Sequence, residues 1–147
     1  MQALTHVAAA DVAIADLQEL IRTHLAINRS LWVNGLVEAS IFREWLFNVE
    51  RRDAQARMAH LLCEISARLE AAGLARELTY DLPMTQEQLG DALGLTSVHI
   101  NRVLKELERG GLIRRRKREV TIIDWHRLRR ATNFNERYLH LDREFAA

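Results

Sequence analysis

The sequence has a single cysteine, a single proline and no long uninterrupted apolar run among its 147 residues. Because Cys63 is alone, the chain cannot form an internal disulfide or supply four thiolates to an iron–sulfur cluster, which favours a cytoplasmic protein. No stretch approaches the roughly 18 consecutive apolar residues that a membrane-spanning helix needs. The N-terminal stretch MQALTHVAAADVAIADL has no basic leader and already contains Asp11 and Asp16, so a secretory signal is not expected.

A large excess of charge is also missing, because 21 Lys and Arg residues nearly balance 20 Asp and Glu residues, for a net charge of +1. The charges are nevertheless unevenly distributed. Residues 97–130 hold 11 Lys or Arg against 4 Asp or Glu, a local net charge of +7. The length is typical of one domain, or of a small domain with an extension. A basic region on a nearly neutral chain indicates a surface that binds a polyanion.

The first half of the chain contains one strong helical pattern, over residues 29–50. Before it, residues 6–14 weakly predict a strand and residues 15–24 a short amphipathic helix. The apolar face of the 29–50 helix is too wide for one partner, so we expect one side to pack on its own chain and the other on a second copy. A central helix of a monomeric bundle would show the same pattern. The expected dimer contacts are Trp32, Val33, Leu36, Val37, Ser40, Ile41 and Trp45.

A second helix is predicted over residues 54–72, AQARMAHLLCEISARLEAA. Asp53 is placed to cap its first turn and Gly73 to end it. Residues 74–84 contain the only proline and predict a loop with a short strand.

Two further helices follow with the spacing of a helix-turn-helix. Thr85 and Gln88 match a capping box that opens a helix at 86–93, and Thr96 is the expected N-cap of the next one. The small Gly90 allows close approach of the second helix, and Gly94 permits the sharp turn. An ordinary helical hairpin would not need small residues at both positions, so the motif indicates DNA binding.

The second of these helices has an apolar face that must point at the core. It consists of Ile100, Val103, Leu104 and Leu107. On the exposed side, Arg102 can bond guanine, Asn101 can bond adenine and Val98 can meet a thymine methyl group. The expected base contacts are Ser97, Val98, His99, Asn101 and Arg102.

A basic run, RRRKR, lies between the β-prone segments LI and VTII after the glycine pair at 110–111. This arrangement predicts a two-stranded hairpin with a basic tip, which is the wing of a winged helix. An isolated block of like charge is more often a disordered tail. The expected phosphate contacts are Thr85, Thr96, Lys105, Arg109, Arg114, Arg115, Arg116, Lys117 and Arg118.

From about residue 29 to 125 the chain resembles the C-terminal part of the Crp/Fnr family of bacterial transcription regulators. The resemblance rests on the long apolar helix, on DAQARMAHLL, on TQEQLGDALGLTSVHINRVLKELERGGLI and on the wing, and is closest to a subgroup with FREW, HLLCE and GLTSVHINR. It implies a mainly α fold, with a long dimerisation helix followed by a winged helix-turn-helix domain and a small β-hairpin wing. The expected domains are a sensor remnant (1–28), the dimerisation helix (29–52) and the DNA-binding domain (53–147).

The resemblance also implies a homodimer on a near-palindromic DNA site, with RNA polymerase as a further partner. The recognition arginine of the family matches Arg102, whereas Ser97 and Val98 depart from the frequent pattern of Arg or Val followed by Glu. Asn101 occupies a position that usually holds a small residue. The family's β-roll sensor is mostly missing, so we expect a sensorless or truncated regulator with no cofactor.

Two other functions compete with this interpretation. An enzyme could use His60, Cys63 and Glu64 as metal ligands on one helix, but a buried thiol is the commoner fate of such a cysteine and no second ligand cluster exists. His126 and His140 lack a catalytic partner at motif spacing. A dimerising decoy with weak DNA binding is the other alternative, although such a protein would not need Arg102 and the basic wing. We therefore expect a DNA-binding regulator and not an enzyme.

Overall fold

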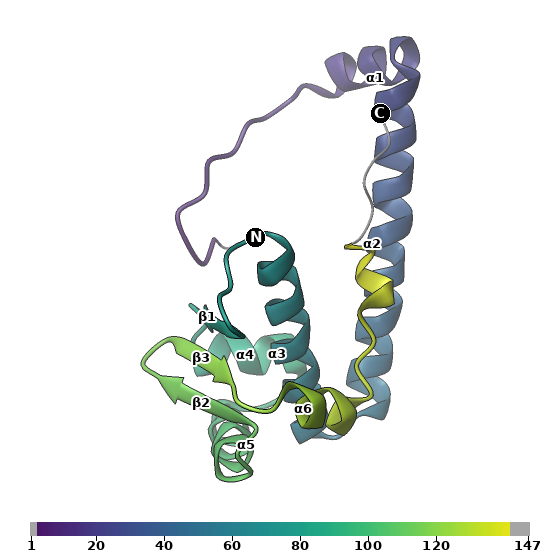
Figure 1. The fold of residues 1–147 in the computed structure, drawn as a ribbon. Coiled ribbons are helices and arrows are strands. Elements are labelled where there is room, and N and C mark those ends of the chain that lie inside the picture. The colour runs from purple at the N-terminus through teal and green to yellow at the C-terminus, as the bar shows by residue number, and fades with distance from the viewer. Residues whose placement is uncertain (1–2, 142–147) are drawn as a thin grey trace.

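The computed structural model describes residues 3–141 as a mainly helical chain with one small sheet (Figure 1). A long helix runs along one side, and most of the other elements gather at its C-terminal end. The elements in chain order are α1 (Ile14–Thr23), α2 (Leu25–Arg51), α3 (Ala54–Ala71), β1 (Thr79–Asp81), α4 (Gln86–Leu93), α5 (Ser97–Arg109), β2 (Ile113–Arg116), β3 (Glu119–Ile122), α6 (Trp125–Thr132) and the 3-10 helix η1 (Glu136–Leu139).

The N-terminal segment differs from the sequence prediction. Residues 3–13 are exposed and contain no strand, so the strand predicted over 6–14 is wrong. A strand is stable only where it can pair with a neighbour, and none of the described strands lies against this segment. The short helix that follows, α1, is confirmed and lies against the start of α2.

Helix α2 has 27 residues and begins four residues earlier than the apolar pattern predicts. Only His24 separates it from α1. The added turn, Leu25 to Asn28, begins with two good helix formers, Leu25 and Ala26, and contains no proline or glycine that would interrupt a helix. The sequence pattern could not show this extension, because these residues lie outside the apolar repeat.

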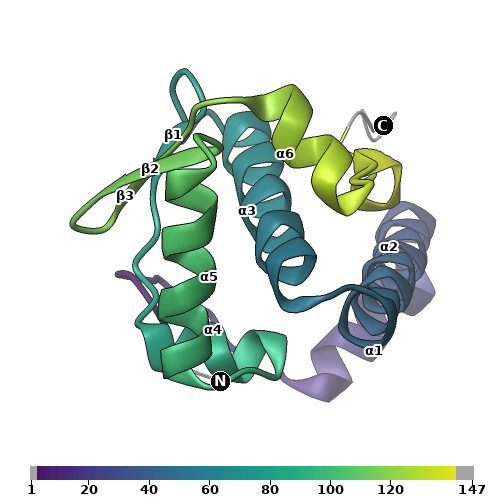
Figure 2. The ribbon, with the colours of Figure 1, turned by 90° about the horizontal axis from the view of Figure 1, so that it is seen from below.

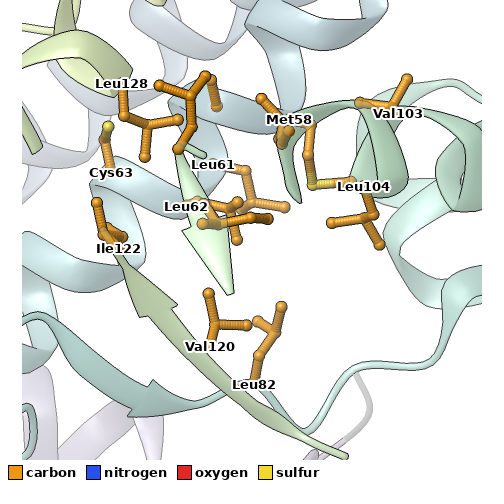
Figure 3. Packing of buried hydrophobic residues seen from close by; sticks show 14 of the residues in the cluster. Met58, Leu61, Leu62, Cys63, Leu82, Val103, Leu104, Val120, Ile122 and Leu128 are labelled. Atoms are coloured by element: carbon orange, nitrogen blue, oxygen red, sulfur yellow. The ribbon is translucent and has the colours of Figure 1, made fainter. Parts of the chain in front are cut away.

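The core of the winged-helix part is built around α3, which packs against α4, α5, α6 and the sheet. Asp53 caps α3 by accepting a hydrogen bond from the backbone N–H of Ala56, as predicted. Figure 3 shows side chains from α3, α5, α6 and the strands meeting in one cluster. Its labelled members are Met58, Leu61, Leu62, Cys63, Leu82, Val103, Leu104, Val120, Ile122 and Leu128.

The sheet has three antiparallel strands in the order β1-β3-β2. Strands β2 and β3 form the predicted hairpin, with Arg116 opposite Glu119 next to the turn. Lys117 has a φ of 58° in that turn, a left-handed conformation that closes it tightly. β1 adds a third strand from the 74–84 loop, with Tyr80 opposite Val120. The hairpin is therefore anchored to the domain along one whole edge.

The C-terminal elements return to the long helix. α6 packs on α3, and η1 lies along the lower part of α2 (Figure 1). Phe134 and Leu139 are buried, and Trp125 and Tyr138 pack against the core. This return fixes the long helix to the winged-helix part.

Candidate nucleic-acid interface

The turn between α4 and α5 depends on two glycines. A Cβ at Gly90 would lie 2.5 Å from the carbonyl oxygen of Leu95, so any larger residue would collide with the turn backbone. Gly94 ends α4 in the left-handed region, with a φ of 65°. The predicted roles of both residues are confirmed, except that the backbone approaching Gly90 is mainly that of the turn and not that of the second helix.

Hydrogen-bonded caps fix the start of each helix. Thr85 and Gln88 form the complete predicted capping box on α4. The hydroxyl of Thr96 accepts a hydrogen bond from the backbone N–H of His99 and so caps α5. α5 therefore leaves the turn in one fixed direction, with its first residues exposed.

Helix α5 has one buried face and one exposed face. Ile100, Val103, Leu104 and Leu107 are all buried, as predicted. The opposite side forms a shallow groove, which we call the recognition face. It is lined by Gln86, Ser97, Val98, Asn101, Arg102, Lys105 and Arg109. Four expected base-contact residues therefore share one surface, and only His99 lies to one side of it, half-buried.

The polar side chains of the recognition face are already partly oriented. Arg102 has a 63% exposed side chain and lies 2.7 Å from the Nε2 atom of His99. The amide nitrogen of Asn101 donates to the Oε1 atom of Gln86 on α4 at 3.5 Å. Val98 is 79% exposed and lies outside the core cluster, so its methyl groups are accessible on this face.

The five cations of the wing, residues 114–118, fall into two groups by exposure. Arg114, Arg116, Lys117 and Arg118 are exposed. Arg115 alternates with its neighbours and faces inward, where its guanidinium lies 2.8 Å from a carboxylate oxygen of Glu108 on α5. That hydrogen bond lowers the pKa of Glu108. Arg115 therefore ties the wing to α5, and Figure 2 shows the two elements side by side.

The long helix α2 is covered on one side only. Ile41 and Trp45, two of the predicted dimer contacts, are half-buried and pack against the core of their own chain. Val33, Val37 and Ser40 are half-buried. An outer stripe of large apolar residues remains exposed on this helix and includes two of the predicted dimer contacts. It consists of Trp32, Leu36, Phe42, Leu46 and Val49.

Sequence reasoning missed a polar cluster where α2, α3 and η1 meet. The Glu64 carboxylate accepts hydrogen bonds from Trp45 at 3.0 Å and from the hydroxyl of Tyr138 at 2.7 Å. His60 lies 3.0 Å from the same hydroxyl, and burial together with the charge of Arg52 lowers the pKa of His60 to about 3. No sequence signal links these residues, because Glu64 and Tyr138 are 74 positions apart.

A metal site is not formed by these residues. Among residues 3–141, no three histidine, cysteine, aspartate or glutamate side chains are grouped so that they could hold a metal ion. Cys63 is fully buried, and burial raises its pKa to about 12, which keeps the thiol protonated and unreactive. Within the described part of the chain, no helix is long and apolar enough to cross a membrane.

Three features define a winged-helix DNA-binding protein. They are a capped helix-turn-helix, an exposed cationic recognition face and an adjoining β-hairpin wing. The family model for a Crp-like helix-turn-helix domain matches residues 56–131. The chain therefore belongs to the Crp/Fnr family of transcription regulators.

Two relatives with assigned functions illustrate this membership. The chain is 35% identical over 116 residues to the transcriptional activator protein FnrL of Cereibacter sphaeroides, covering 76% of this chain and 46% of that protein. It is 27% identical over 123 residues to the transcriptional activator protein anr of Pseudomonas aeruginosa, covering 84% of this chain and 50% of that protein. The chain thus spans about half the length of these relatives.

The fold also matches a solved structure. FixK2 from Bradyrhizobium japonicum superposes with a TM-score of 0.72 at 25% identity, covering 80% of this chain and 57% of that one. The match includes more of the chain than the family model does, so the likeness extends beyond the helix-turn-helix domain.

Proposed function

We propose that this chain is a cytoplasmic, sequence-specific DNA-binding regulator of transcription that acts as a homodimer. The observation that carries the proposal is the recognition face of α5. It presents cationic, amide and apolar side chains together on a helix whose start is fixed by a cap and a tight turn. Such a helix fits the major groove, where each base pair offers a distinct set of donors, acceptors and methyl groups.

Base recognition is assigned to the N-terminal half of α5. Arg102 would donate two hydrogen bonds to a guanine, and Asn101 would bond an adenine or a neighbouring polar edge. Ser97 would add a further hydrogen bond, and the exposed Val98 would contact a thymine methyl group. Because Val98 replaces the acidic residue that is frequent in the family, this chain would select a different half-site from regulators that have it.

Phosphate contacts are assigned to the ends of this surface. Lys105 and Arg109 lie further along α5, and the hydroxyls of Thr85 and Thr96 can still donate while accepting their capping hydrogen bonds. On the wing, four exposed cations would neutralise phosphates. They are Arg114, Arg116, Lys117 and Arg118.

The homodimer would form along the outer stripe of α2. A second copy of the same helix covers such a stripe with matching residues, because a twofold interface uses one surface twice. The two recognition helices would then contact half-sites about 34 Å apart, one turn of DNA, in a near-palindromic operator. The relatives named above are activators, which supports RNA polymerase as a further partner.

DNA binding by these 147 residues would not require a cyclic nucleotide or an iron–sulfur cluster. Residues 3–24 contain no strand from which a sensor β-roll could be built, and Cys63 is a buried thiol. The caps and the turn of the helix-turn-helix are made by protein groups alone. The same DNA sequences should therefore be bound with and without added cyclic AMP.

The proposal is tested by selecting bound sequences from a random DNA pool. We expect an enriched near-palindrome, with or without cyclic AMP, and we expect Arg102→Ala to cost about 1–3 kcal/mol and to relax the preference at one base pair of each half-site. Arg130→Ala on α6 is a control that removes an exposed cation outside the recognition face. If the protein is a dimer but enriches no sequence, it is a decoy. If the wild-type protein and Arg102→Ala both bind all sequences equally, the assignment of Arg102 is overturned.

A further inference from the structure

The neighbour of Arg102 on α5 is a histidine in an unusual arrangement. A terminal nitrogen of the Arg102 guanidinium lies 2.7 Å from the Nε2 atom of His99, one helical turn earlier. A guanidinium has only donors, so Nε2 must be the acceptor. A histidine that accepts at Nε2 is neutral and carries its proton on Nδ1. The contact therefore exists in only one protonation state of His99.

The surroundings of this pair restrict both side chains. The backbone of His99 is fixed by the Thr96 cap, at 3.3 Å. Arg102 also faces Glu106, which lies 4.0 Å from its Nε atom on the other side. The pair adjoins a hollow between α5 and the start of α3, where Asp53 and Gln55 are the facing residues. The guanidinium is thus oriented by α5 itself, before any DNA is present.

We propose that His99 is a positioning residue for Arg102 and makes no base contact of its own. This inference rests on the proposed function, because it assumes that Arg102 bonds a guanine. His99 lies on the flank of α5, half-buried, whereas the recognition face is formed without it. An arginine that is already oriented loses less conformational freedom on binding, and a misdirected one cannot make the two parallel hydrogen bonds that identify guanine.

Protonation of His99 gives the inference a distinctive signature. A protonated imidazole has no acceptor, so the contact with Arg102 is lost and two like charges stand side by side. The added charge also attracts phosphate, so general affinity for DNA would not fall. Asp53 and Glu106 are the carboxylates near this pair. Acid should therefore reduce discrimination between sequences without reducing binding to unrelated DNA.

The test compares the selected operator with a copy altered at the base pair assigned to Arg102. Discrimination is the ratio of the two affinities, measured at about pH 5 and about pH 8, below and above the range in which histidine titrates. At the higher pH, we expect His99→Leu to reduce discrimination about three- to tenfold, the range expected for the loss of one typical hydrogen bond. His99→Gln should retain most of it, because the amide oxygen of Gln can accept in place of Nε2.

The pH comparison separates positioning from a structural role. Discrimination by the wild-type protein should fall at about pH 5, whereas that of His99→Gln should change little, because Gln does not titrate. His126→Gln on α6 is a matched control that removes an exposed histidine elsewhere, and it should keep the wild-type pH profile. Unaltered melting temperatures would show that the variants fold.

Two results would overturn the inference, and they differ in what else they overturn. If His99→Leu discriminates like wild type while Arg102→Ala does not, His99 has no positioning role but the proposed function survives. If Arg102→Ala also discriminates like wild type, Arg102 contacts no guanine, so its assignment within the proposed function fails and the inference fails with it. An equal loss at about pH 5 in wild type and His99→Gln would also exclude His99 as the titrating group.

Discussion

Helix α5 buries all of its apolar residues except Val98 within its own chain, whereas helix α2 leaves a row of large apolar residues in solvent. Ile100 and Leu107 on α5 are completely buried. On α2, Trp32 is 67% exposed, Phe42 is 64% exposed and Leu36 is 50% exposed. Both helices belong to one chain, and the difference is that only α2 keeps a row of large apolar side chains that the chain itself does not cover.

The winged-helix part has a complete core, and its remaining exposed side chains are mostly polar or cationic. The outer stripe of α2 extends along much of a helix about 40 Å long, which no described element of the chain covers. Exposed apolar rows of this size usually mark an interface. The comparison therefore distinguishes a domain whose apolar residues are mostly covered by its own chain from a helix whose exposed stripe the proposed homodimer would cover.

The largest expected effect comes from creating a cavity in the core beneath the buried face of α5. Leu104→Ala should lower the free energy of unfolding by about 2–5 kcal/mol, because it leaves a cavity between α5 and α3. Urea denaturation at fixed protein concentration measures this change. A loss below about 1 kcal/mol would mean that α5 is less tightly packed than its burial indicates.

A charge introduced into the outer stripe should weaken the association of two copies without destabilising the core. Leu36→Glu should raise the dimer dissociation constant at least about tenfold, because a carboxylate buried in an apolar interface is strongly unfavourable. Sedimentation measures the change. Asn34→Glu places the same charge on another side of α2 and should leave the dissociation constant within about twofold. Equal effects of both variants would contradict the proposed stripe.

The wing offers a smaller and more selective test. Arg116→Gln should reduce the slope of log affinity against log salt concentration by about 1, because one phosphate contact is lost. Arg115→Gln should change the slope less, since Arg115 faces Glu108. Titrations on one DNA at several salt concentrations give both slopes. A larger change for Arg115 than for Arg116 would reverse the two roles.

The smallest effect is the pH dependence of the Arg115–Glu108 pair. Arg115 lowers the pKa of Glu108 in the folded protein, so the pair stabilises the fold above the ordinary glutamate pKa of about 4.3. That stability is lost as the pH falls through the lowered folded value. The wild-type protein should thus exceed Arg115→Gln in unfolding free energy by about 0.2–1 kcal/mol at neutral pH. Denaturation curves across the acid range should show this difference shrinking, and a constant difference would contradict the assignment.

Local signals in the sequence predicted the local structure well. Asp53, Thr85 and Thr96 cap helices as expected, because a cap depends on residues two or three positions away. The fold class and the family follow from the same signals together with the glycine spacing. The strand over residues 6–14 failed because pairing depends on distant partners.

Long-range contacts explain the remaining differences. Periodicity revealed two apolar stripes on α2 but not which one the chain itself covers, so it could not show that Ile41 and Trp45 pack against their own core. Arg115 is equivalent to its four basic neighbours in the sequence and differs only through Glu108 on another element. The contact of Tyr138 with Glu64 joins residues that no local pattern relates.

The most direct test of the account uses the selected operator and a version with about five extra base pairs at its centre, half a turn of DNA. A homodimer held along α2 positions its two recognition helices rigidly, so we predict a loss of affinity of at least about tenfold for the lengthened site, with a complex that contains twice the 17.0 kDa chain mass on the original one. Equal affinity for both sites would contradict the central claim that two copies, joined through α2, bind DNA as one unit.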